Sequence, residues 1–172
     1  MDSGDGGEFT SIHGYSPNSM DTHFTVTTNV FKGRLHRFRY RARNAVGWGA
    51  FSEEASILAA NPPSRPDSPR FLGFSLGTLT VSVTPSTDNG GTDLIGTELW
   101  CDAGDDFTSE FSQINGYDGE SPTYGFTEAV DGLIPGKTYR LRTRSLNAIG
   151  ASAYSIVAYV AFGGVPSAPG QP

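Results

Sequence analysis

The sequence has almost no cysteine: Cys101 is the only one among 172 residues, so no disulfide can form within the chain. A small domain held together by disulfide bridges is therefore excluded. Long apolar runs are also lacking, since none approaches the roughly 20 residues of a membrane-spanning helix. No window of a dozen residues keeps the period of an amphipathic helix. The opening MDSGDGGEFT is polar and acidic, which predicts that this segment carries no signal peptide.

Turn-forming residues are plentiful, with 22 glycines and 11 prolines, and serine and threonine are abundant as well. This mixture predicts many short strands joined by turns, and therefore an all-β chain. A length of 172 residues leaves room for one large domain or about two small ones. The formal net charge of −6 argues against a nucleic-acid partner.

An internal repeat at a spacing of 103 residues divides the chain into two units. NAVG at 44–47 falls on NAIG at 147–150, and the proline-rich PSRPDSP at 63–69 falls on PSAPGQP at 166–172. Each unit is therefore expected to end in the same proline-rich joint, which favours extended backbone and limits flexing.

Two motifs of the second unit resemble those of fibronectin type III domains. LTVSVTPSTDNGGTDLIGTELW (79–100) looks like strand B of that family with its Asp/Asn-Gly-Gly turn, and LIPGKTYRLRTRSLNAIG (133–150) is similar to its E–F corner and strand F. The chain departs from the family at Val83 and Ser145, where Trp and Ala are usual. The resemblance implies immunoglobulin-like antiparallel β-sandwiches in tandem.

The repeat and the resemblance together predict four segments. Residues 1–62 are expected to be the C-terminal part of a type III domain without strands A to C, followed by a linker at 63–69, a complete domain at 70–165 and the start of another linker at 166–172. The first unit aligns with the second from about Gly104 onward.

An incomplete sandwich would leave its inner face uncovered. The apolar side chains expected to lose cover are Phe24, Val26, Phe38, Tyr40, Ile57 and Leu58. The first unit is therefore not expected to be stable alone. Three explanations stay open: a boundary cutting through a domain, strands supplied by another chain or another copy, or an atypical reduced fold.

Arginine recurs at every second position of two segments. The residues are Arg37, Arg39, Arg41 and Arg43 in the first unit, and Arg140, Arg142 and Arg144 in the second. Alternate residues of a strand share one face, so these side chains are expected to form a ladder on the outside of each sheet. Neighbouring like charges repel, so other groups should offset them.

The resemblance places strand C beside strand F, which brings Glu98 and Trp100 next to the second ladder. A salt bridge and cation–π contacts are expected there. In the first unit, Trp48 is expected to fold back over Arg41 or Arg43, because segment 48–52 is loosely similar to the Trp-Ser-x-Trp-Ser box of cytokine-receptor type III domains. The ladders are interpreted as self-neutralised outer faces, and docking of an acidic partner is the alternative.

Two aligned residues are expected to form a corner. Tyr139 takes the place of the family's corner tyrosine, whose hydroxyl bonds the chain upstream, and His36 aligns with it. Cys101 has no His or Cys partner at metal-ligand spacing, and we expect a solvent-side or half-buried thiol.

The acidic clusters Asp102, Asp105 and Asp106, and Asp88 with Asp93, lack the spacing of a calcium loop. No catalytic residue, cofactor or metal site is predicted.

The sequence thus favours a non-enzymatic structural, adhesive or scaffolding segment of a larger repeat protein, with a protein partner that could supply the missing strands. A protein- or glycan-binding module and an accessory domain of an enzyme are the alternatives. Loops rich in Gly, Asp, Asn and Ser favour the structural role, whereas Tyr117 and Tyr124, expected to be exposed, are the best evidence for recognition. The resemblance favours an extracellular or cell-surface location over a cytoskeletal or ciliary one.

Overall fold

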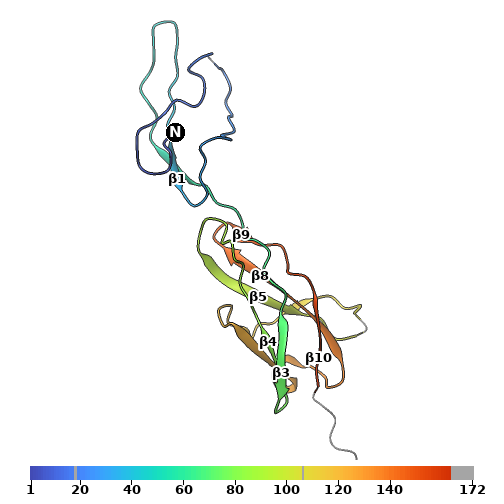
Figure 1. Cartoon of the computed structure of the whole chain (residues 1–172). Helices are drawn as coiled ribbons and strands as arrows, with labels where there is room; N and C mark the ends of the chain where they lie inside the picture. Colours follow the sequence, from blue (N-terminus) through green and yellow to red (C-terminus); the bar gives the residue numbers. More distant parts are fainter. Residues whose placement is uncertain (18, 106, 164–172) are drawn as a thin grey trace, which may run out of the picture. The chain divides into compact units, whose positions relative to one another are not determined.

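The computed structural model describes residues 1–17, 19–105 and 107–163, which form two compact units (Figure 1). Unit 1 comprises Met1–Asn61 with Gly90–Thr92, and unit 2 comprises Pro62–Asn89 with the chain from Asp93 onward. The fold is all-β and antiparallel, as the composition predicts, and the described residues contain one helix of four residues. Within the described ranges, no helix is long and apolar enough to cross a bilayer. The joint expected at 166–172 lies outside the described residues.

Unit 2 is built from two antiparallel sheets. The first consists of β3 (Arg70–Ser75), β4 (Thr78–Ser82) and β7 (Thr123–Thr127), in that order. The second consists of β10 (Ala158–Ala161), β8 (Thr138–Asn147), β5 (Leu94–Cys101) and β6 (Ser112–Gln113), with β9 (Gly150–Ala151) also paired to β8. The helix α1 (Glu128–Asp131) follows β7 directly.

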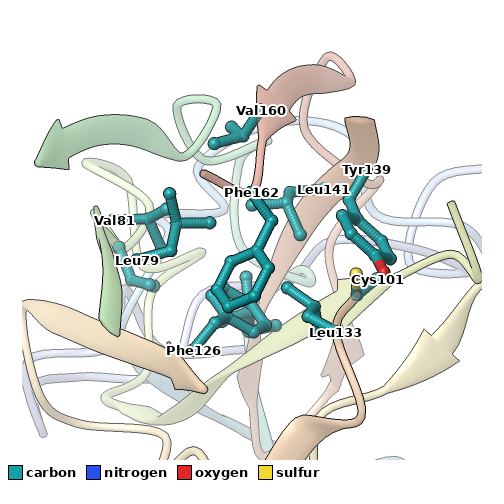
Figure 2. Packing of buried hydrophobic residues seen from close by; sticks show 11 residues of the cluster. Leu79, Val81, Cys101, Phe126, Leu133, Tyr139, Leu141, Val160 and Phe162 are labelled. Carbon is teal, nitrogen blue, oxygen red and sulfur yellow. The ribbon is translucent and has the colours of Figure 1, made fainter. Parts of the chain in front are cut away.

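The core of unit 2 is formed by side chains that alternate along the strands. Strand β8 alternates half-buried and buried residues over its whole length, and Tyr139, Leu141 and Thr143 point inward. They pack with residues of the other strands, and Figure 2 shows Phe126 and Phe162 near the centre of this cluster. Fully burying a large apolar side chain stabilises a domain by about 1.5–3 kcal/mol, so this cluster holds the two sheets together.

Cys101 belongs to this core, and the expectation of a solvent-side or half-buried thiol is wrong. The side chain is 4% exposed, and the inward positions of β5 are Thr97, Leu99 and Cys101, two residues apart. Because side chains alternate along a strand, a residue two places after the buried Leu99 faces the core as well.

The Cys101 thiol is expected to be unreactive in the native chain. Burial, with the nearby charges of Asp102 and Asp131, raises the pKa of this thiol to about 12. Since the thiolate is the nucleophile, alkylation by iodoacetamide at pH 8 should be more than about a hundredfold slower in buffer than in denaturant. Mass spectrometry of timed samples measures both rates. Similar rates in the two conditions would contradict the buried position.

Tyr117 and Tyr124 are half-buried, so the expectation that both are exposed is wrong. Their rings meet edge to face, with centroids 5.9 Å apart. The Tyr117 hydroxyl donates to the Ser121 carbonyl oxygen at 2.6 Å, and the Tyr124 hydroxyl donates to the Asp131 carboxylate at 2.7 Å. Both polar ends are thus engaged within unit 2, which leaves neither ring free as a recognition anchor.

Unit 1 has two short strands, β1 (Leu35–Phe38) and β2 (Ala55–Leu58), paired antiparallel. Beyond β1 the chain continues to an isolated bridge between Arg43 and Trp48. Of the side chains expected to lose cover, Phe24, Tyr40, Ile57 and Leu58 are exposed, while Val26 and Phe38 are half-buried. Instability of this unit alone stays a prediction.

Candidate functional site

The outer face of β8 carries the second ladder opposite β5. The strand register sets Trp100 opposite Arg142 and Glu98 opposite Arg144. The Arg144 Nε donates to a Glu98 carboxylate oxygen at 2.6 Å, and the Trp100 indole N–H donates to the same oxygen at 2.9 Å. Glu98 and Trp100 therefore lie beside the arginines of β8, and one carboxylate joins the two strands.

Aromatic rings separate the guanidinium groups of this ladder. Arg142 lies between Phe111 and Tyr154, at 4.0 and 3.7 Å from the ring centroids. Arg144 lies 4.9 Å from the Tyr154 ring and 5.4 Å from the Trp100 ring. The Arg142 Nε is buried and has no hydrogen-bond partner in the described part of the chain, so stacking on the two rings is its main compensation.

Arg140 is anchored differently, by the buried carboxylate of Asp102. Its Nε donates to Asp102 Oδ2 at 2.7 Å, its backbone N–H donates to Oδ1 at 2.9 Å, and its Nη2 donates to the Ser109 carbonyl oxygen at 2.6 Å. The Asp102 side chain is fully buried. Asp102 thus binds the first arginine of the ladder.

In the part of the chain that the structure describes, the acidic cluster around Asp102 does not form a metal site. Asp105 accepts a hydrogen bond from the Ser109 N–H at 3.1 Å. The described residues contain no group of three acidic, His or Cys side chains that could hold a metal.

Unit 1 repeats this anchor with Asp2 and Arg37. The Arg37 Nε donates to Asp2 Oδ2 and its backbone N–H to Oδ1, both at 2.8 Å, while Nη2 donates to the Gly7 carbonyl oxygen at 2.9 Å. Asp2 is 1% exposed. The same three arginine groups therefore make equivalent bonds in both units.

The Asp2 anchor is expected to depend on pH. Hydrogen bonds from the Arg37 backbone and guanidinium lower the pKa of Asp2 from 3.8 to about 2. A carboxyl with a lower pKa in the folded state adds stability above pH 3.8, and this contribution disappears as the pH falls toward 2. Protection of the Arg37 amide against hydrogen exchange should therefore fall between about pH 4 and pH 2. The Asp2→Asn variant should lack this step, and titration of Asp2 near 3.8 by NMR would contradict the anchor.

The ladder of unit 1 is also interleaved with aromatic rings. Phe9 lies 4.0 Å from Arg39, and Phe51 lies 4.3 and 4.5 Å from Arg39 and Arg41. The Trp48 ring centroid lies 4.6 Å from the Arg41 guanidinium carbon. It also lies 5.4 Å from that of Arg43.

Among the described residues, carboxylates contact only the first two arginines of this ladder, Arg37 and Arg39. Glu54 contacts Arg37 at 3.4 Å and Arg39 at 4.0 Å. Within the described part of the chain, no carboxylate oxygen lies within 4.0 Å of Arg41 or Arg43. The counterpart of Arg41 is Arg144, whose partner is Glu98.

The two corner residues make the same backbone bond. The Tyr139 hydroxyl accepts from the Ile134 N–H at 2.7 Å, and the His36 Nε2 accepts from the Phe31 N–H at 3.2 Å. In both units the donor is five residues upstream. Because His36 Nε2 accepts, the ring proton lies on Nδ1, which faces the Asp2 carbonyl oxygen at 3.2 Å. The corner therefore adjoins the aspartate anchor in unit 1.

The repeated NAVG and NAIG segments form side-chain-closed turns. Asn44 Oδ1 accepts from the N–H groups of Val46 and Gly47, and Asn147 Oδ1 accepts in the same way from Ile149 and Gly150. An asparagine that bonds backbone two residues ahead stabilises a turn. Each turn ends its arginine ladder.

The sequence interpretation missed the aspartate anchors and the stacked Phe9, Phe111 and Tyr154. The anchors carry a signal, since Asp2-Ser3-Gly4 and Asp102-Ala103-Gly104 share Asp-x-Gly, and the glycine N–H bonds the aspartate in both. Their spacing is 100 residues, not 103. The aspartate precedes its arginine by 35 residues in unit 1 and 38 in unit 2. The correspondence of the units thus reaches Asp102, slightly before the expected Gly104.

No family model matches the sequence. Fibronectin type-III domain-containing protein 3A of Homo sapiens is 30% identical over 151 residues, which covers 84% of this chain and 11% of that protein. The chain is homologous to fibronectin type III domains. The counterpart from Gallus gallus is 28% identical over 145 residues, covering 81% of this chain and again 11% of the relative. The chain thus spans about a tenth of the curated relatives it matches.

Two solved structures share this fold. A solution structure of a human fibronectin type III domain has a TM-score of 0.51 and 25% identity, covering 66% of this chain and 88% of that one. A crystal structure of titin domains has a TM-score of 0.56 and 14% identity, covering 87% of this chain and 52% of that one. These likenesses agree with the antiparallel sheets of unit 2.

Proposed function

We propose that this chain is a non-enzymatic structural segment of a larger multi-domain protein, in which type III units link or space other parts for adhesion or scaffolding. The observation that carries the proposal is the ladder of unit 2. Arg140, Arg142 and Arg144 are all engaged by carboxylates or aromatic rings of the same unit. A face whose charges are satisfied internally stiffens the sheet and leaves little for a ligand to gain.

The second part of the proposal concerns a protein partner for unit 1. Phe24, Tyr40 and Ile57 are 50%, 79% and 58% exposed, although all three are large apolar side chains. Their burial would stabilise unit 1, because removing apolar surface from water is favourable. Strands from another chain or from a neighbouring domain would supply this cover.

A structural spacer is expected to resist extension as one unit. With handles fused to both ends of the full chain, optical tweezers should show a single cooperative step for unit 2. Unfolding of residues 70–162 would lengthen the chain by roughly 300 Å, given about 3.3–3.6 Å per extended residue. Gradual lengthening without a step would contradict a load-resistant spacer.

A further inference from the structure

The sequence contains two Asn-Gly pairs, Asn89-Gly90 and Asn115-Gly116. In such a pair the backbone nitrogen of the glycine can attack the side-chain amide of the asparagine, because glycine carries no Cβ to hinder the approach. Asparagine is accordingly among the thermolabile residues of proteins. The attack requires that both reacting groups be free of hydrogen bonds and that the local backbone can move. The surroundings of the two pairs therefore determine which of them can react.

Asn115 and Gly116 form the centre of a turn that follows β6. Both residues are exposed, and the Tyr117 N–H closes the turn by donating to the Ile114 carbonyl oxygen at 3.2 Å. Among the described residues, neither the Asn115 side chain nor the Gly116 N–H has a hydrogen-bond partner. High exposure and few hydrogen bonds mark a segment that opens at a low cost in free energy. Both reacting groups are therefore available in this pair.

The Asn89-Gly90 pair, in contrast, is held in place. Gly90 is buried, and its carbonyl oxygen accepts from the Asn61 N–H at 2.8 Å. The Asn89 carbonyl oxygen accepts a hydrogen bond from the Asn147 Nδ2 at 2.8 Å. This backbone cannot turn toward the Asn89 side chain without breaking these bonds. The pair therefore serves as an internal reference for the exposed one.

We propose that Asn115 is a site of spontaneous deamidation, at which the side-chain amide is converted to a carboxylate without an enzyme. The Gly116 nitrogen forms a bond to Asn115 Cγ while the Cγ–Nδ2 bond breaks, and Nδ2 leaves as ammonia with the proton of the Gly116 N–H. Water then opens the succinimide ring at either of its carbonyls, which gives an aspartyl or an isoaspartyl residue. Water is the only co-reactant, and nothing is oxidised or reduced.

The isoaspartyl product disturbs a tight fit around the turn, because its main chain runs through the former side chain and is one carbon longer. Gly116 has little room to move, since a Cβ placed on it would lie 2.6 Å from the Tyr124 hydroxyl oxygen. On the other side of Asn115, the Ile114 N–H donates to the Leu99 carbonyl oxygen at 2.8 Å and extends the short pairing of β6 with β5. The longer backbone is therefore expected to break this bond and to loosen β6 at the edge of its sheet.

The test is peptide mapping of the full chain during incubation at mildly alkaline pH, with mass spectrometry to follow the conversion of each asparagine. In native buffer Asn115 should lose its amide more than about tenfold faster than Asn89, whose reaction waits for local unfolding. In urea the two rates should converge, because the protection of Asn89 depends on the fold. Equal rates in native buffer, or an intact Asn115, would overturn the proposal.

A variant of the attacking residue tests the chemical route. Gly116→Ala should slow the reaction at Asn115 severalfold, since the added Cβ hinders the attack. This variant is made in a Tyr124→Phe background, which removes the hydroxyl oxygen that the new methyl group would meet. The Tyr124→Phe chain is the matched control. Deamidation at the same rate in the two chains would contradict attack by the Gly116 nitrogen.

Hydrogen exchange of the aged chain measures the structural consequence. The isoaspartyl form should exchange the Ile114 amide more than about tenfold faster than the fresh chain, because the bond to Leu99 is lost. The Asn115→Asp variant carries the same added charge on an ordinary backbone and should exchange as the fresh chain does. Unchanged exchange in the isoaspartyl form, or equal acceleration in Asn115→Asp, would contradict the effect of the longer backbone on β6.

Discussion

The Phe126→Ala variant is expected to lose about 3–5 kcal/mol in the free energy of unfolding of unit 2, as large aromatic truncations in cores do. Phe126 is 0% exposed in the middle of β7, and its ring meets Tyr124 edge to face with centroids 4.9 Å apart. Its place in the core is visible in Figure 2. The truncation removes buried apolar surface and leaves a cavity between the two sheets that the strands cannot close.

Urea denaturation of the full chain measures this loss. Trp100 reports on unit 2, and a Trp48→Phe background removes the signal of unit 1. The control is Val130→Ala in α1, where the side chain is 76% exposed and the change should stay within about 0.5 kcal/mol. If Phe126→Ala matches this control, the described core is wrong.

The Asp102→Ala variant is expected to be about as damaging, with a loss of about 3–5 kcal/mol. The Asp102 side chain is fully buried. It accepts from the Arg140 Nε and backbone N–H at 2.7 and 2.9 Å, and from the Gly104 N–H at 3.2 Å. Removing the carboxylate leaves these donors without their acceptor and leaves the Arg140 charge without its counterion.

One further variant separates charge from hydrogen bonding at this position, and a variant at another position serves as its control. Asp102→Asn keeps an oxygen for the backbone donors but loses the ion pair, so a smaller loss of about 1–3 kcal/mol is expected. Glu120→Ala removes an exposed carboxylate nearby in the sequence and should be close to neutral. Equal stability of Asp102→Ala and Glu120→Ala in the same urea experiment would contradict the anchor.

The alternation of side chains is the feature that sequence predicts best here. In RLRTRSLN (140–147), apolar and small residues alternate with arginine, and the structure turns Leu141 and Thr143 inward with the arginines on the outer face. Strand pairing reduces the choice to two faces, and the cost of burying guanidinium groups decides between them.

Contacts between segments that are far apart in the chain are harder to predict from the sequence. The environment of Cys101 follows from its parity with Leu99, which places the thiol in the core, and not from its position at the end of β5. The aspartate anchors were missed because they lie 35 and 38 residues from their arginines. The number of residues between each aspartate and its arginine depends on the length of the loops between them, which no local sequence periodicity predicts. Phe111 and Tyr154 lie in loops, so no strand periodicity predicts where their rings stack.

Amide hydrogen exchange of the full chain tests the central claim most directly. That claim is that both units share one anchored arginine segment, which is paired on both sides in unit 2 and on one side in unit 1. The account predicts slow exchange at Arg142 and Arg144, which pair with β5, and fast exchange at Arg39 and Arg41. Equal protection of all four amides, or fast exchange at Arg142 and Arg144, would contradict it.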